Sequence, residues 1–257
     1  MAPMNDLLNN YYNKFNEDKR LETRHGIIEF QTTINHVLEV LNKFTNPKIL
    51  DIGAGTGKYS LYLDNLGYDV TAVELVKHNL KIIQSKNKNL KSYLGNALNL
   101  DFLGNNTYDV ILMFGPLYHL FGDDKLKAIN EALKHLNDNG YLMICYCLND
   151  FAILKHGFFD GHILDDTKYD KNYLIKDNES NLYSFDTMDS INNINKLCNL
   201  KREKIFSQEG LTEYVRPIIN KMTSKEFTKY LDFHLQRCES PYYLGLSRHV
   251  VDIVKKS

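Results

Sequence analysis

Three glycines at alternate positions, Gly53, Gly55 and Gly57, constrain this chain more than any other feature. The residues before them, 48–52, are typical of a short buried strand, and residues 59–66 can continue as a helix. A strand, a glycine turn and a helix in this order point backbone N–H groups toward a ligand at the carboxyl end of the strand. Glycine suits such a turn because it accepts a positive φ and has no Cβ to hold a ligand away. The turn therefore predicts a nucleotide-like ligand.

Strands and helices alternate through the first part of the chain, which predicts an α/β fold with a doubly wound parallel sheet. The predicted strands are residues 48–52, 68–74, 90–94, 108–114 and 141–148, and the predicted helices are 27–41, 59–66, 77–84 and 123–136. The later elements are a helix at 187–197, a strand at 200–207, helices at 211–222 and 224–238, and a last strand within 245–254. Pro217 should kink or break the first of those two helices, because proline lacks the N–H that a helix interior needs.

The overall charge is nearly balanced, with 31 Lys and Arg against 32 Asp and Glu. A chain with this balance has no excess of positive charge to attract a nucleic acid or an acidic membrane surface. No apolar run approaches the length of a membrane span, and residues 1–6 show no signal peptide pattern. We therefore expect a cytoplasmic protein, either a monomer or a homodimer, with no nucleic-acid or membrane partner.

The four cysteines show no paired spacing of the kind that binds a metal: Cys145, Cys147, Cys198 and Cys238. Cys145 and Cys147 lie in an apolar run whose alternation points both side chains the same way. We interpret them as packing residues, and a redox or metal pair is the alternative. No metal site is expected.

The glycine turn departs from two common nucleotide-binding motifs. The dinucleotide fingerprint has its third glycine where this chain has Lys58, and the ATP-binding P-loop needs Ser or Thr where it has Tyr59. The turn instead resembles the first motif of the class I S-adenosylmethionine-dependent methyltransferases. That motif reads Asp-x-Gly-x-Gly-x-Gly after a strand and here begins at Asp51.

Three further landmarks follow in the order of that family. Glu74 ends the second predicted strand, where a forked carboxylate can accept both ribose hydroxyls. Asn96 stands in Gly-Asn-Ala where many of these enzymes have Gly-Asp-Ala, and its amide oxygen can still accept from the adenine amino group. Residues 115–120 read Gly-Pro-Leu-Tyr-His-Leu, which is similar to a motif of a bacterial subgroup.

The resemblance covers residues 48–148 and implies that S-adenosyl-L-methionine is the cofactor and S-adenosyl-L-homocysteine the product. It also implies a seven-stranded Rossmann-like sheet whose last strand is antiparallel. The residues expected to contact the cofactor are Tyr11, Arg24, Asp51, Gly53, Ala54, Gly55, Gly57, Glu74, Leu75, Asn96, Ala97, Leu98, Phe114 and Gly115.

Within this family resemblance we expect one domain, because no repeat and no Pro/Gly linker divides the chain. Its parts would be an N-terminal helical cover (1–46), a cofactor-binding core (47–148), a lid insertion (149–186) and a C-terminal part of the sheet with a helical cap (187–257). The lid is expected because 149–185 is long, irregular and rich in aromatic residues, which argues against a disordered insert.

Methyl transfer from a sulfonium is an in-line displacement, so the protein mainly aligns the acceptor and excludes water. Tyr118 and His119 are the catalytic and substrate candidates, since they follow the fourth strand. His119 could be a general base, given its ordinary pKa, or it could cap the next helix or pack beneath the cofactor. Tyr118 could form a pocket wall.

The remaining candidate site residues lie either before the glycine turn or after Tyr118 and His119 in the sequence. Phe158 and Phe159 in the lid and His234 complete the expected substrate set, although a satisfied, partly buried histidine is favoured for His234. Arg24 could hold a carboxylate through its fork or be a solvated charge at a helix start. The side chains of Glu239, Arg248 and His249 could line a cap.

The predicted function is methyl transfer to O or N of a small-molecule or short-peptide acceptor. The residues after strand four do not read Asn/Asp-Pro-Pro-Tyr/Phe, the pattern of many enzymes that methylate amino groups of bases, and no Pro-Cys loop of a cytosine-C5 enzyme is present. An aromatic insertion fits a covered small-molecule pocket. A non-catalytic cofactor-binding module and an RNA or protein methyltransferase are the alternatives.

Overall fold

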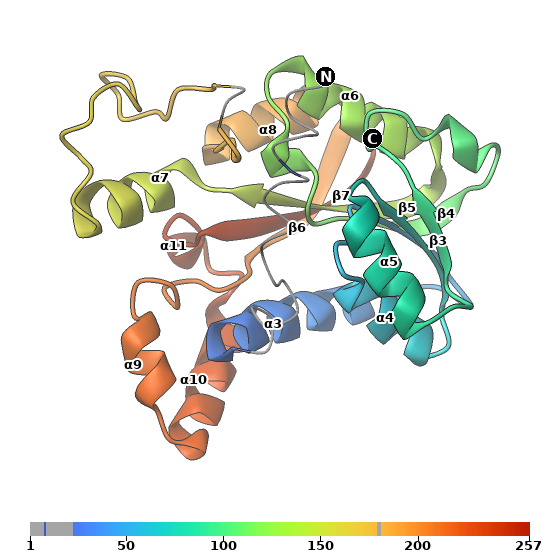
Figure 1. Cartoon of the computed structure of the whole chain (residues 1–257), viewed down its shortest axis with the longest axis horizontal. Helices are drawn as coiled ribbons and strands as arrows, with labels where there is room; N and C mark the ends of the chain where they lie inside the picture. The colour runs from blue at the N-terminus through green and yellow to red at the C-terminus, as the bar shows by residue number, and fades with distance from the viewer. Residues whose placement is uncertain (1–7, 9–22, 179–180) are drawn as a thin grey trace.

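A seven-stranded sheet crosses the computed structural model, which describes residue 8, residues 23–178 and residues 181–257 (Figure 1). The strand order is β3-β2-β1-β4-β5-β7-β6. Neighbours from β3 to β5 run parallel, and β7 is antiparallel to both β5 and β6. The predicted α/β sheet with an antiparallel last strand is confirmed. The strands are β1 (Lys48–Ile52), β2 (Asp69–Glu74), β3 (Lys91–Leu94), β4 (Tyr108–Met113), β5 (Leu136–Cys147), β6 (Leu200–Ser207) and β7 (His249–Lys256).

Helices pack on both faces of the sheet and divide the core in two. One buried cluster joins the sheet to α3, α4 and α5, and the other joins it to α6 and α8. The central strands are buried on both sides, as their continuous apolar runs predict. The helices are α3 (Arg24–Leu41), α4 (Lys58–Asn65), α5 (Lys77–Lys86), α6 (Asp123–Lys134), α7 (Asn149–Ala152), α8 (Met188–Leu197), α9 (Arg216–Lys221), α10 (Ser224–Arg237) and α11 (Pro241–Leu244).

The sequence places most element boundaries within a few residues, and the largest differences have local causes. The helix predicted over 211–222 is wrong for its first part, because α9 begins only at Arg216. Pro217 lies in the first turn of α9, where its missing N–H costs nothing, and therefore starts the helix and does not kink it. Strand β5 begins at Leu136 and not at residue 141. Tyr108 of β4 pairs with Leu136, and the register then shifts before Tyr141, so residues 137–140 form an irregularity within the strand.

The expected lid region starts as helix and then loses regular structure. Asn149–Ala152 forms α7, and a π-helix follows over Ile153–Phe159. At the other end of the region, the buried side chain of Lys125 on α6 pairs with Asp186 at 2.6 Å. This pair fixes the point where the chain returns to the sheet.

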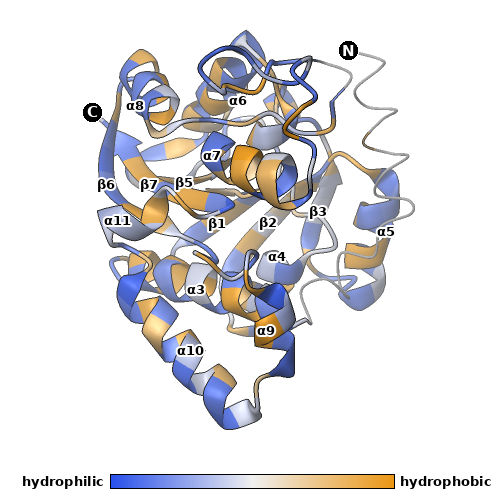
Figure 2. Cartoon of the chain, turned by 90° about the vertical axis from the view of Figure 1, so that its left-hand side faces the viewer, coloured by the Kyte–Doolittle hydropathy of each residue, from blue (hydrophilic) through white to orange (hydrophobic). Residues whose placement is uncertain are grey.

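Two helices project away from the sheet below the ends of α3 and α11. α9 and α10 form this projection in both views, and in Figure 2 α10 carries both hydrophilic and hydrophobic residues on its visible side. A capping box starts α10, with the Thr223 hydroxyl accepting from the N–H of Glu226. None of the helices in the described ranges is long and apolar enough to cross a membrane.

Candidate active site

A cavity of about 380 Å³ opens at the edge of the sheet where the parallel strands end. The residues after β1, β2, β3 and β4 line one part of it, and residues of α3 and of the chain next to β7 line the other part. Because β7 is antiparallel, its first residues lie at the edge where its neighbours finish. We call the part beside β1, β2 and β3 the cofactor end and the part beside β7 the acceptor end.

The glycine turn forms the floor of the cofactor end. Gly53, Gly55 and Gly57 have φ values of +74°, +58° and +85°, a region that side-chain-bearing residues rarely adopt. A Cβ at Gly55 would meet no atom within 4 Å, so the backbone there faces open space. A Cβ at Gly53 would lie 2.6 Å from the Pro116 ring. The turn therefore offers an open cradle and packs tightly against the loop after β4.

Two buried carboxyl groups flank this turn and line the cavity. Glu74 at the end of β2 accepts the N–H of Gly55 and the N–H of Val76, each at 2.7 Å. Burial raises the pKa of Glu74 to about 7, although these backbone bonds oppose the rise. Burial also raises the pKa of Asp51 to about 6 against the hydrogen bond donated by Ser60.

The segment after β3 closes the cofactor end. Gly95, Asn96 and Ala97 all line the cavity. The amide oxygen of Asn96 accepts the N–H of Leu98 at 3.0 Å, which fixes the side chain in a tight turn. Leu98 itself is buried in the core cluster and does not line the cavity. An open glycine cradle, a forked carboxyl group and an amide at three successive strand ends fit the amino acid, ribose and adenine portions of S-adenosylmethionine.

Tyr118 and His119 lie in the short 3₁₀ helix η2 (Leu117–His119) and both line the cavity. The Nδ1 of His119 lies 2.7 Å from the Leu182 carbonyl, which only accepts, so Nδ1 carries the proton. Burial lowers the pKa of His119 to about 4, although the bond to Leu182 opposes this. The ring is therefore neutral near pH 7, and the expectation of a base with an ordinary pKa does not hold.

Tyr183 joins these two rings from the far end of the expected lid. Its ring centroid lies 5.1 Å from that of His119 and 5.9 Å from that of Tyr118. It lines the cavity, unlike Phe158 and Phe159, which are 55% and 71% exposed. Phe158 and Phe159 are the residues of this segment that the sequence predicts for the site, and an irregular loop has no periodicity that indicates which ring turns inward.

Two further expected site residues serve packing and do not line the cavity. Arg24 donates to the carbonyl oxygens of Ile219 and Met222 at the end of α9 and lies over the Phe227 ring. His234 is fully buried, and its Nε2 lies 3.0 Å from the carbonyl oxygen of Gln208. Tyr11 lies outside the described residues. The other expected cofactor residues line the cavity: Asp51, Gly53, Ala54, Gly55, Glu74, Leu75, Asn96, Ala97, Phe114 and Gly115.

Gly57 does not line the cavity but begins α4 as its N-cap residue. A Cβ there would lie 2.9 Å from the Ile83 side chain. Its positive φ turns the chain from the glycine turn into the helix, so its role is to shape the cradle.

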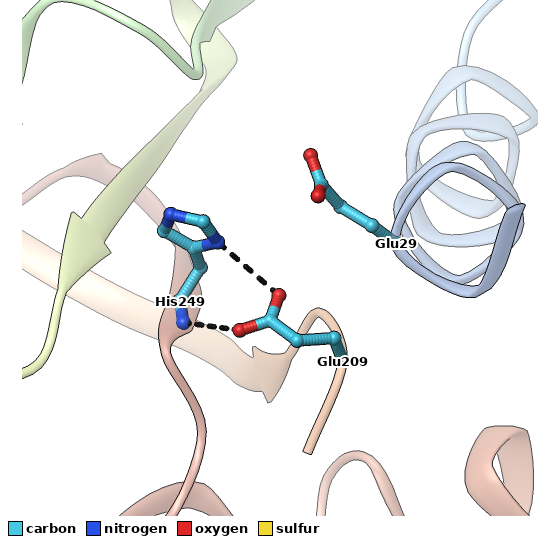
Figure 3. Close-up of side chains that lie close together, drawn as sticks. All are labelled: Glu29, Glu209 and His249. Carbon is cyan, nitrogen blue, oxygen red and sulfur yellow. Dashed lines mark hydrogen bonds and ion pairs between the residues drawn. The ribbon is translucent and has the colours of Figure 1, made fainter. Parts of the chain in front are cut away.

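A polar cluster forms the acceptor end (Figure 3). Glu209 accepts the backbone N–H of His249 at 2.6 Å and pairs with His249 Nδ1 at 3.2 Å. Burial alone would lower the pKa of His249, but Glu209 and Cys147 outweigh it and raise the pKa to about 10. Glu29 faces this pair from α3, as Figure 3 shows. Arg248 also lines the cavity, whereas Glu239 pairs with His36 and Lys204 outside it.

The three residues of Figure 3 offer a donor set that could hold a metal ion, since their ligand atoms lie within 4.8 Å of one another. Glu209, however, already uses both carboxylate oxygens on His249. His249 keeps its proton at neutral pH and carries a positive charge. The cluster is therefore arranged as an internal ion pair.

Comparison with known proteins agrees with the fold and with the cofactor end. Residues 50–144 match the family model of a methyltransferase domain. An uncharacterized methyltransferase of Staphylococcus carnosus is 28% identical over 119 residues, which cover 45% of this chain and 56% of that protein. The chain thus matches about half the length of this relative.

Two solved structures share the fold over nearly the whole chain. The PH0226 protein of Pyrococcus horikoshii has a TM-score of 0.60 at 14% identity, covering 96% of this chain and 99% of that one. A methyltransferase of Thermotoga maritima, described as S-adenosylmethionine-dependent and as a possible histamine N-methyltransferase, has a TM-score of 0.59 at 17% identity, covering 96% and 98%. With the sheet order, the glycine cradle and Glu74, these matches show that the chain has the class I methyltransferase fold and that residues 50–144 carry the sequence pattern of a methyltransferase domain.

Proposed function

We propose that this chain transfers the methyl group of S-adenosylmethionine to an oxygen or nitrogen atom of a small-molecule acceptor. The observation that carries the proposal is one cavity that joins the glycine turn to a second, polar end beside β7. A cavity with two chemically different ends can hold a cofactor and an acceptor together. Holding both reactants in line is the main task of a methyltransferase, since the cofactor supplies the activated methyl group.

The residues at the cofactor end would bind and orient. The backbone of Gly53 and Gly55 would lie along the amino acid portion, and the carboxylate of Glu74 would accept the ribose hydroxyls. Asn96 would lie beside the adenine. We expect the contacts of Asp51 to be indirect, because its carboxyl group is engaged by Ser60.

The rings between the two ends would exclude water and stabilise positive charge. Tyr118, His119 and Tyr183 pack against one another where β4 ends, between the cofactor and acceptor ends. Aromatic faces attract a cation, and the uncharged ring of His119 does not repel it. With a pKa near 4, His119 is a weak base at pH 7, so we propose that it positions the acceptor and does not remove a proton.

The cavity also bears on the two alternatives. A non-catalytic module would be favoured by a blocked pocket beside Tyr118 and His119, whereas both residues line the open cavity. An RNA methyltransferase would be favoured by a basic surface, whereas the formal net charge is −1. Both observations support an enzyme with a small acceptor.

Calorimetry tests the proposal at its first step. The wild type should bind S-adenosylhomocysteine, and Gly55→Asp should lose this binding, since it puts a carboxylate into the open cradle next to Glu74. Gly67→Asp is the matched control, because Gly67 also has a positive φ and open space around it but lies outside the turn. No binding by the wild type, or equal binding by Gly55→Asp, would refute the proposal. A screen of small alcohols, phenols and amines for S-adenosylhomocysteine release would then identify the acceptor.

A further inference from the structure

The side chain of Arg248 lines the acceptor end of the cavity. Its backbone carbonyl accepts the N–H of Leu148, which fixes Arg248 between the end of β5 and the start of β7. Within residues 23–178 and 181–257, its guanidinium makes no hydrogen bond and no ion pair. A guanidinium carries five N–H donors, and leaving them without acceptors in a partly buried position is unfavourable.

The nearby carboxylates do not satisfy these donors. Glu209 and Glu29 are close enough to raise the pKa of Arg248, but within the described residues neither makes a hydrogen bond or ion pair with its guanidinium. Glu209 contacts His249 with both of its oxygens (Figure 3). The hydroxyl of Ser247 adds a third, longer contact to Glu209 at 3.3 Å. Arg248 thus adds a positive charge to a cluster whose histidine is already protonated. Because His249 pairs with Glu209, the guanidinium of Arg248 keeps N–H donors that an anionic ligand can accept.

Other basic side chains that line the cavity have partners. Arg216 donates to Glu213 at 3.2 Å, and the Lys58 ammonium lies 5.1 Å from the centre of the Phe30 ring. Arg248 therefore differs from both in having no direct partner among the described residues. A planar guanidinium binds a carboxylate through two parallel hydrogen bonds, which gives both affinity and orientation.

Two ligands could bring a carboxylate into the cavity, namely the cofactor through its amino acid portion and the acceptor. The glycine turn follows β1, and Glu74 and Asn96 follow β2 and β3, so the cofactor residues extend from β1 away from β7. From β1 to β7 there are three strand spacings, about 14 Å. This separation favours the acceptor.

Resting on the function proposed above, we propose that Arg248 binds a carboxylate of the methyl acceptor, so that the acceptor is a small organic acid. Arg248 would be a specificity-determining residue, since its two parallel hydrogen bonds would orient the acid with its nucleophilic atom toward the rings of Tyr118 and His119.

The experiment compares Arg248→Met with Arg237→Met, which removes an exposed arginine from the last turn of α10. Calorimetry first measures S-adenosylhomocysteine binding by the wild type and both variants. Each protein, saturated with S-adenosylhomocysteine, is then titrated with acetate, benzoate and 3-phenylpropionate and with the corresponding amides. Because the cofactor product is already bound, its own carboxylate cannot account for added binding.

We expect all three proteins to bind S-adenosylhomocysteine within about twofold of one another. At least one carboxylate should bind the wild type and Arg237→Met tenfold or more tightly than its amide, and Arg248→Met should lose this preference. Arg248→Lys, which keeps the charge without the fork, should retain only part of it and serves if the methionine variant does not fold.

Three results would overturn the inference. The wild type could bind acids and amides alike, Arg248→Met could keep the preference, or Arg248→Met could weaken S-adenosylhomocysteine binding tenfold or more. The last result would assign the guanidinium to the cofactor's carboxylate. A wild type that does not bind S-adenosylhomocysteine would refute the proposed function itself and this inference with it, so the two failures are distinguished by the first titration.

Discussion

The protonation state of Glu74 should control the affinity for the cofactor. Its carboxyl group links the glycine turn to the residue before α5, with one oxygen accepting the N–H of Gly55 and the other accepting the N–H of Val76. Burial raises its pKa to about 7, so a proton competes with the ligand near neutral pH. A carboxylate has more acceptor sites for the two ribose hydroxyls than a protonated carboxyl group has. Affinity for S-adenosylhomocysteine should therefore rise as the pH rises through 7.

The size of this effect follows from the pKa. With a pKa of about 7, the ionised fraction of Glu74 rises from about a tenth at pH 6 to about nine-tenths at pH 8. The affinity should rise about tenfold over the same interval if the carboxylate is the binding form. Asp51, whose pKa of about 6 is also raised, is mostly ionised over the upper half of this range and contributes less.

The stability of the cofactor-free protein should change in the opposite direction. The folded-state pKa of Glu74 is about 7 against an ordinary value of 4.5, so between these pH values the folded state holds a proton that the unfolded state has lost. The free energy of unfolding then falls as the pH rises through this window, by at most about 3 kcal/mol. As the pH rises through 7, the ionisation of Glu74 should therefore raise the affinity for S-adenosylhomocysteine and lower the free energy of unfolding.

Calorimetry at pH 6, 7 and 8 and constant ionic strength would measure the affinity, with Glu74→Gln as the control. Glutamine keeps the shape of the side chain but does not titrate, so its affinity should be flat and no higher than that of the wild type at pH 6. A flat wild-type profile would refute the reasoning. A variant that follows the wild-type slope would assign the pH dependence to another group.

Two substitutions test how the site is supported. Gly53→Ala should lower the free energy of unfolding by about 2–4 kcal/mol in urea denaturation, because φ is +74° and the new Cβ would lie 2.6 Å from the Pro116 ring. An unchanged midpoint would show that the turn accommodates the methyl group. Lys125→Met should cost about 3–5 kcal/mol by leaving the buried carboxylate of Asp186 unpaired, whereas Lys91→Met removes an exposed pair and should cost less than about 1 kcal/mol. Equal losses in these two variants would contradict the assignment of a buried pair.

The cofactor end could be predicted from the sequence because each of its parts is local. The glycine turn, Glu74 and Asn96 each follow a parallel strand directly, and parallel strands bring their carboxyl ends to one edge of the sheet. Reading the strands correctly was therefore enough to place these residues around one cavity. Gly57 shows the limit of this reasoning, since its position in the motif did not show that it faces Ile83 and not the cavity.

The acceptor end could be predicted only in part because its residues come from distant segments. Glu29 lies on α3, Tyr183 lies in the irregular segment, and Arg248 and His249 stand at the start of β7. An antiparallel last strand places its first residues at the edge where the other strands end, which is why the polar residues near the chain's end reach the cavity. No local sequence pattern indicates that the ring of Tyr183 points into the cavity, because its position depends on packing against Tyr118.

Arg24 and His234 show why residue type alone misplaced two site residues. Both are chemically suited to binding, but each satisfies backbone carbonyl groups that would otherwise lack donors. Arg24 donates to carbonyl oxygens at the end of α9, which a helix terminus leaves unpaired, and His234 contacts the carbonyl of Gln208 in a fully buried position. Which carbonyl groups need a side-chain donor is decided only when elements distant in the sequence pack together.

The charges along the cavity give its two ends different tasks. Carboxyl groups line the cofactor end, where burial raises the pKa values of Glu74 and Asp51. The acceptor end combines Glu29 with the protonated His249 and with Arg248, whose guanidinium makes no hydrogen bond or ion pair within the described residues. A cationic cofactor is favoured at the first end and an anionic acceptor at the second, so each ligand would be disfavoured in the other's place. The neutral ring of His119 lies between them and adds no charge to either. This difference in charge between the two ends is the reason to test carboxylates before neutral acceptors.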